Sequence, residues 1–423
     1  LTAKGNIEDL FSQNGVKINI LFDEQTLIKL FALSSVPELG RLKGRLLLSD
    51  VNGSLGIEEI QVETDDSKLI DLKIKGGVND LLKSNQINLN TEFSIPDMAL
   101  FGKLFDIDFP DLGPVKGAGR WHGKEKNGVF KGRFTVGKTA LDSDISVSLA
   151  GSVPRVNGII SSPNIYLEDF GIHPEDRSSK GTEKVSGPLF SRNPLPLSIL
   201  QKINLDLHAS AREVTGVNYH LDKMNVNLSF HNGRLKIAPA KFVFSEGSIV
   251  LNAEVFAGKT PEFTLSIKGS SIQLGDLISE LHQPPAIEGD LDLIVDLKSR
   301  GSTAHEVASN LSGDFGLMLE GGKIRKRELE LLFLNPLGWL FSHGISGNEL
   351  QISCGLARYK IHQGIADSKV LYINGPKLMA RGKSEINLKK ETINALANLE
   401  KKKLLFNTRV SLQIKGSLAD PEI

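Results

Sequence analysis

The sequence predicts a mainly β protein, in which an elongated, curved antiparallel sheet forms a groove built from repeated meander units. A few short helices are expected at its edges and ends. Three observations predict this fold class. Apolar and polar residues alternate through many short runs, one segment recurs at a spacing of roughly 73 residues, and helical patterns are too few to supply the crossovers of a parallel sheet.

The clearest alternation lies in residues 224–268, which we interpret as a β-meander. Successive side chains of a strand point to opposite faces, so Val226, Leu228 and Phe230 share one face. Asn232-Gly233 is the dipeptide that a two-residue hairpin turn prefers. Pairing about this turn places Phe230 opposite Leu235 and Leu228 opposite Ile237, so that both strands present the same apolar face.

Two further turns are predicted within the meander. A turn at Glu246-Gly247 places Phe244 opposite Ile249 and Phe242 opposite Leu251. A turn at Pro239-Ala240 brings Ile237 beside Phe242 on the same face. This turn rests on the weakest pattern of the three.

The N-terminal part, residues 1–172, is expected to consist of β-groove repeats. A strand is predicted over 16–22 and a short helix over 24–33, capped by Asp23. The segment PELGRLKG from Pro37 returns as PDLGPVKG from Pro110, and a weaker echo, PAIEGDLDL, starts at Pro285. Residues 173–198 are rich in Pro, Ser, Gly and charge, which predicts a flexible loop or boundary.

Residues 199–423 are expected to form a second β-groove region. Leu291, Leu293 and Val295 share one strand face, and Phe315 and Leu317 resume the period of two. Between them, Thr303 and Glu306 form a capping-box pattern for a short helix. Strands are also predicted around 350–361, 369–374 and 378–388.

Helical character is strongest at 325–341, which is apolar almost all round and interrupted by Asn335-Pro336. One interpretation is a helical cap that closes one end of the sheet. The alternative is an interfacial helix whose basic residues meet lipid head groups while its apolar residues enter the acyl boundary. The possible membrane-surface contacts are Arg325, Lys326, Arg327, Leu337, Trp339 and Phe341.

Composition excludes several classes of function. Fifty basic and fifty acidic residues give no net charge, so no global field attracts nucleic acid. The single cysteine, Cys354, cannot form an internal disulfide. No apolar run is long enough for a membrane-spanning helix. The chain opens on Leu1 rather than Met, so we expect a fragment or processed form whose missing start carried an export signal or membrane anchor.

Catalytic and metal-binding motifs are absent from the sequence. No two of the nine histidines have HxH, HxxxH or HExxH spacing. Gly117, Gly119 and Gly123 lack the spacing of a dinucleotide-binding loop, and turn or packing roles explain them better. We therefore expect no cofactor, no metal and no enzymatic activity.

The apolar face of so many strands needs a cover, because a large exposed apolar surface promotes aggregation. A parallel β-helix is disfavoured because the repeat is long and based on hairpins. Acyl chains lying in an open groove would supply the cover. The predicted groove-lining residues are Leu228, Phe230, Leu235, Ile237, Phe242, Phe244, Ile249, Leu251, Leu293, Val295, Phe315 and Leu317.

Diffuse motifs in residues 190–423 resemble the C-terminal region of the AsmA family. They include the Pro-Leu-rich FSRNPLPLS, the strand and turn SFHNGRL, the segment SEGSIVL, and the closing VSLQIKGSLADPEI. The resemblance implies a repeating β-groove thought to pass phospholipids between the inner and outer membranes of Gram-negative-type bacteria. It also implies a periplasmic location and an N-terminal inner-membrane anchor that this chain lacks.

The resulting hypothesis is non-enzymatic phospholipid transport that contributes to outer-membrane homeostasis. Phospholipids, the inner membrane and outer-membrane components are the expected partners. The main alternative is an assembly factor that uses exposed strand edges to assist the folding of outer-membrane proteins. A hydrolase on a β scaffold is a second alternative, which requires a buried acid-base pair.

Overall fold

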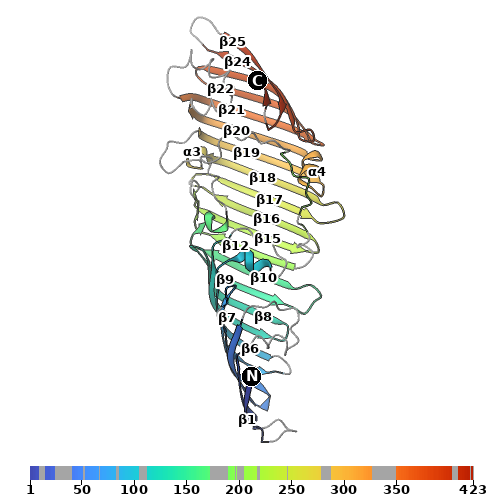
Figure 1. The fold of residues 1–423 in the computed structure, drawn as a ribbon. Helices are drawn as coiled ribbons and strands as arrows, with labels where there is room; N and C mark the ends of the chain where they lie inside the picture. Colours follow the sequence, from blue (N-terminus) through green and yellow to red (C-terminus); the bar gives the residue numbers. More distant parts are fainter. Residues whose placement is uncertain are drawn as a thin grey trace. The chain divides into compact units, whose positions relative to one another are not determined.

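Strands dominate the structure, a computed structural model shown in Figure 1. It describes residues 1–8, 15–23, 41–50, 53–65, 67–81, 85–103, 112–171, 189–195, 197, 204–216, 220–244, 246–277, 287–325, 349–402, 408–419 and 421–422. Short strands β11 (Ile165–Tyr166), β13 (Val214–Thr215) and β14 (His220–Leu221) are grouped apart, and the other 23 described strands form the long ladders. The predicted mainly β, antiparallel fold class is confirmed.

The chain divides into two compact units. The first comprises Leu1–His173 and Ile203–Gly216, and the second comprises Pro174–Lys202 and Val217–Ile423. Each unit is built on its own run of strands that pair with their neighbours in sequence.

In the first unit, antiparallel pairing proceeds in sequence order from β1 to β10. The last strand, β12, pairs with β10 in parallel. The strands are β1 (Thr2–Asn6), β2 (Lys17–Asp23), β3 (Arg41–Ser49), β4 (Gly56–Asp65), β5 (Asp71–Asp80), β6 (Asn85–Ile95), β7 (Val115–Lys124), β8 (Asn127–Val136), β9 (Thr139–Ser148), β10 (Arg155–Ser162) and β12 (Asn204–Ala211).

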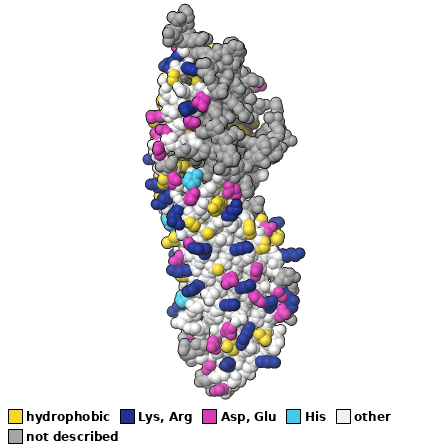
Figure 2. All heavy atoms as spheres, turned by 90° about the vertical axis from the view of Figure 1, so that its left-hand side faces the viewer, with side chains coloured by type: hydrophobic (Ala, Val, Ile, Leu, Met, Phe, Trp, Pro, Cys, Tyr) yellow, Lys and Arg dark blue, Asp and Glu magenta, His cyan; other side chains and the backbone are white. Residues whose placement is uncertain are grey.

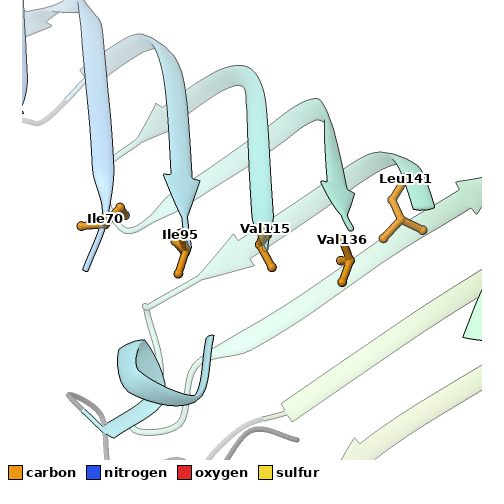
Figure 3. Close-up of a cluster of buried hydrophobic side chains, with 5 residues drawn as sticks. All are labelled: Ile70, Ile95, Val115, Val136 and Leu141. Carbon is orange, nitrogen blue, oxygen red and sulfur yellow. The ribbon is translucent and has the colours of Figure 1, made fainter. Parts of the chain in front are cut away.

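The strand ends of the first unit bury a small core. Figure 3 shows arched strands whose ends bring apolar side chains together. Helix α2 (Met98–Gly102) and the 3-10 helix η3 (Leu167–Phe170) contribute Met98, Phe101 and Phe170 to its edge. The buried members are Ile70, Ile95, Val115, Val136 and Leu141.

The second unit is a continuous antiparallel ladder from β15 to β26 in sequence order, which can be followed in Figure 1. The short helices α3 (Leu274–Leu277) and α4 (Ala304–Ser309) connect strands at its margins. The strands are β15 (Lys223–His231), β16 (Arg234–Val243), β17 (Ser248–Phe256), β18 (Glu262–Gln273), β19 (Ile287–Arg300), β20 (Ser312–Arg325), β21 (Glu349–His362), β22 (Ile365–Asn374), β23 (Leu378–Asn387), β24 (Thr392–Lys401), β25 (Thr408–Ser417) and β26 (Pro421–Glu422).

The meander at 224–268 exists, but only its first turn was predicted correctly. Phe230 pairs with Leu235 and Leu228 with Ile237 about Asn232-Gly233, and both turn residues have positive φ, 51° and 76°. The second hairpin pairs Phe242, not Phe244, with Ile249. Phe244 N donates to the Gly247 carbonyl oxygen at 2.9 Å, so the hairpin closes one residue earlier than the predicted Glu246-Gly247 turn requires.

No turn exists at Pro239-Ala240. Strand β16 runs through both residues, and its pairing with β15 and β17 shifts register beside Pro239. A bulge accommodates the missing N–H of proline without ending the strand. Leu251 lies opposite Ala240 rather than Phe242, as the pairing of Phe242 with Ile249 requires.

Several other predictions fall on defined elements. The strand predicted at 16–22 corresponds to β2, and the strands predicted at 350–361, 369–374 and 378–388 lie in β21, β22 and β23. Thr303 Oγ1 accepts from Glu306 N at 3.1 Å, as the capping pattern predicts for α4. The predicted helix at 24–33, most of the loop at 173–198 and nearly all of the helical cap at 325–341 lie outside the described residues.

Candidate functional site: an apolar face and its cavity

Side chains opposite one another across a ladder share a face, so the strand register defines one apolar face of the second unit. One row of this face crosses eight strands without a charged residue. From β18 to β25 it contains Ile272, Leu291, Leu319, Gly355, Ile373, Ala380, Leu399 and Val410.

Two neighbouring rows extend the same face toward β15. One joins Ile267, Val295, Phe315 and Tyr359. The other joins Leu293, Leu317, Ala357 and Leu371. We refer to these three rows and the residues paired with them as the apolar face.

The register places eleven of the twelve predicted lining residues on the apolar face. Phe244 lies one residue beyond the end of β16 and is buried. Most of the others are half-buried, and Val295 is the one that is buried. Apolar side chains therefore remain partly accessible along this face, in the part of the chain that the structure describes.

The opposite face of the second unit is polar and salt-bridged. Lys360 Nζ lies 2.7 Å from Asp314 Oδ2, and Arg234 pairs with Glu254. Ile294 is an exception, with 55% of its surface exposed among these polar neighbours. Figure 2 shows one side of the molecule, on which basic and acidic side chains are interspersed and the hydrophobic ones are scattered.

A cavity of about 400 Å³ opens on the apolar face between β20 and β25. Its lining is almost entirely hydrocarbon, and Leu350, Ile352 and Leu378 at its edge are nearly inaccessible to solvent. Of the twelve predicted residues only Leu317 lines it. The lining residues that the prediction missed include Leu319, Ile373, Ala380, Leu399, Leu412 and Ile414.

The signal for these missed residues was present in the sequence. The alternation in 350–361, 369–374 and 378–388 predicts strands, but it does not say which phase of the alternation faces the groove. Bulges in the β21–β22 and β22–β23 pairings change that phase.

A hydrogen bond from Arg133 lowers the pKa of Asp142, and hydrogen bonds to Glu63 and Asp65 raise the pKa of Lys43. These groups belong to the first unit. Within the described residues no three His, Cys, Asp or Glu side chains are grouped to hold a metal ion.

Of the possible membrane-surface residues at 325–341, Arg325 alone belongs to the described residues. Arg325 ends β20, and Lys326, Arg327, Leu337, Trp339 and Phe341 lie outside the described residues. Among the helices of the described residues, none has the length and apolar character needed to cross a membrane.

Comparison with known proteins gives one family. The sequence model of the AsmA family matches residues 20–369. AsmA family protein YhjG of Escherichia coli (strain K12) is 21% identical over 371 residues, which cover 82% of this chain and 54% of that protein. The chain therefore spans about half the length of this curated relative. No solved structure matches the chain.

Proposed function

Because the chain belongs to the AsmA family, we propose that it carries phospholipids on the apolar face of its second unit. Members of this family are membrane-associated envelope proteins, and membership indicates a role in outer-membrane or lipid-related biogenesis. The proposal adds the cargo and the route, namely phospholipid movement between the inner and outer membranes without enzymatic chemistry.

The observation that carries the proposal is the continuity of the apolar face. One of its rows crosses eight strands without a charge and contributes to a hydrocarbon-lined cavity. Burial of apolar surface contributes about 25 cal/mol per Å², so acyl chains would bind there favourably. A uniform hydrocarbon lining offers few strong local sites, which suits a surface along which lipids move.

The proposed location follows from the proposed cargo. This part of the protein would lie in the periplasm and be anchored to the inner membrane. Its partners would be phospholipids and components of the outer membrane.

A double substitution on the apolar face tests lipid binding. Leu293 and Leu317 face each other across β19 and β20. In the L293D/L317D variant we expect several-fold less phospholipid to copurify, because two carboxylates would lie among acyl chains. Mass spectrometry of lipids extracted from the purified chain gives the measurement.

A matched control moves the same charges to the other face. Ile294 and Met318 neighbour these positions in the same two strands but point away from the apolar face. The I294D/M318D variant should retain its lipid. Wild-type chain that folds and carries no lipid, while crosslinking to nascent outer-membrane proteins, would overturn the proposal in favour of an assembly factor.

A further inference from the structure

Three hydroxyl groups interrupt the apolar face of the second unit. Tyr359 of β21 pairs with Ser368 of β22, and Ser384 of β23 lies beside them. Tyr359 Oη lies 2.8 Å from Ser384 Oγ, and Ser384 N donates to Ser368 Oγ at 2.7 Å. Tyr359 and Ser384 line the cavity, and Ser384 is only 9% exposed.

The hydrogen bonds within this hydroxyl cluster leave protons unused. Each hydroxyl has one proton to donate and two lone pairs to accept with. The Tyr359–Ser384 bond uses one of its two protons, and Ser368 acts as an acceptor toward Ser384 N. Among the described residues, the second proton of the pair and the proton of Ser368 have no acceptor. The cluster therefore offers two donors at a hydrocarbon wall.

The polarity of the cavity changes along the strands. From Tyr359, the cavity lining on β21 continues through Ala357 to Ile352 and Leu350, which are 4% and 5% exposed. In the other direction one further apolar pair, Ile361 and Ala366, precedes the turn at Gln363-Gly364 and does not line the cavity. The cluster thus lies at the end of the cavity that is nearer to the turns.

The hydrocarbon stretch is long enough for an acyl chain. Seven residue steps separate Ala357 from Leu350, which at about 3.3 Å per residue is roughly 23 Å. One acyl chain occupies about half of a hydrocarbon core of roughly 30 Å, or about 15 Å. A lipid with its chains toward Leu350 and Leu378 would bring its chain linkages to Tyr359.

We propose that Tyr359, Ser368 and Ser384 bind the ester carbonyl groups of a diacyl lipid. Ester carbonyl oxygens are acceptors attached directly to acyl chains, so they match donors at the edge of a hydrocarbon surface. The inference rests on the proposed function and makes it more specific. The cluster distinguishes ester-linked lipids from ether-linked lipids of the same length, and it sets the direction in which the chains lie.

The test compares two probes that differ in the carbonyl groups alone. Vesicles contain equal amounts of diacyl phosphatidylethanolamine and its dialkyl ether analogue, and mass spectrometry measures how much of each the purified chain takes up. We expect wild type to prefer the diacyl lipid by about two- to tenfold, the effect of one or two neutral hydrogen bonds. The Y359F/S384A variant should take up both lipids equally, with total uptake close to wild type.

Single variants guard against a failure of the double variant to fold. Y359F and S368A each remove one hydroxyl and should each reduce the preference. Ser353 is an exposed residue of β21 that does not line the cavity, and S353A should keep the wild-type preference. Uptake of both lipids without preference in wild type, or an unchanged preference in Y359F and S368A, overturns this inference alone. Uptake of neither lipid instead overturns the proposed function.

Discussion

At the scale of single residues, Glu391 anchors the segment 189–195 to the second unit. Its carboxylate accepts from Leu189 N at 2.6 Å and from Phe190 N at 3.3 Å. His305 Nδ1 lies 3.7 Å from the same carboxylate, and His305 N donates to the Ser191 carbonyl oxygen. One side chain therefore connects the β23–β24 turn to this segment and to α4.

Lowering the pH should release this segment. The hydrogen bond from Leu189 is the largest cause that lowers the pKa of Glu391, and burial opposes it. A carboxyl whose pKa is lower in the folded state stabilises that state above its unfolded pKa, about 4.3 for glutamate. The contribution is lost as pH falls through the lowered pKa. Hydrogen exchange at Leu189 and Phe190, corrected for its intrinsic pH dependence, should accelerate over that range.

The variant E391Q provides the control at neutral pH. It keeps the shape of the side chain and removes its charge, so charge-assisted hydrogen bonds become weaker neutral ones. Hydrogen exchange at the Leu189 and Phe190 amides should be faster than in wild type. It should also be nearly independent of pH between about 3 and 5, the range over which a glutamate titrates. Unchanged exchange in E391Q would show that the carboxylate does not anchor the segment.

At the scale of elements, glycine permits close packing of aromatic rings in the first unit. Gly119 in β7 faces Gly132 in β8. A Cβ atom at Gly119 would lie 2.6 Å from Phe130 Cε2 and 2.8 Å from the Lys131 carbonyl oxygen. The ring of Phe130 therefore occupies the space that a side chain at position 119 would need.

The G119A variant should unfold more easily than wild type. The added methyl group must displace a ring and backbone, which typically costs about 1–3 kcal/mol. The midpoint of urea unfolding, followed on the unit that carries the substitution, measures the loss. At Gly316 in β20 the nearest atom to an added Cβ is 3.9 Å away, so G316A should be close to neutral. Equal effects of the two substitutions would contradict the packing argument.

The strands and their alternation could be predicted from the sequence, whereas their register could be predicted only in part. Asn232-Gly233 fixes its hairpin because both residues accept positive φ. Glu246-Gly247 gave the wrong register because the hairpin closes one residue earlier, at Phe244 and Gly247, and the local sequence does not show this displacement. The prediction placed Pro239 in a turn, because proline rarely occurs within a strand. Whether a bulge accommodates it depends on the neighbouring strands, which the local sequence does not show.

The candidate site was predictable to the same extent. The alternation predicts one shared face for Leu293, Val295, Phe315 and Leu317. The strand register places these residues opposite one another on that face. The cavity and its hydroxyl cluster depend on the bulges in β21–β23, where Tyr359 and Ser368 come opposite each other only after a shift. No pattern in the sequence marks that shift.

At the scale of the whole molecule, the balance of charges distinguishes this protein from proteins that bind their ligands by electrostatic attraction. Fifty basic and fifty acidic residues cancel, and ion pairs such as Lys360–Asp314 and Lys131–Asp144 intersperse the two signs on the polar faces. Attraction to phospholipid is therefore expected to come from the apolar face, whose eight-strand row contains no charge.

Lipid uptake should consequently depend little on ionic strength. Salt screens charge interactions but does not weaken burial of hydrocarbon. We expect the rate of uptake from vesicles to be similar at low and high sodium chloride, and similar for neutral and anionic vesicles. A fluorescent phospholipid transfer assay measures the rate. A steep fall with salt would show that a charged surface dominates the encounter.

Sequential pairing also bears on how such a protein evolves. Because each strand of the second unit contacts mainly the strands that precede and follow it in the sequence, duplication of one hairpin adds two strands, or roughly 10 Å of sheet, without rebuilding the rest. The recurring segments at Pro37, Pro110 and Pro285 precede β3, β7 and β19, as expected of such duplications. The number of hairpin copies then sets the length of the sheet, and side-chain volume sets the cross-section of the groove. Selection can act on the two separately.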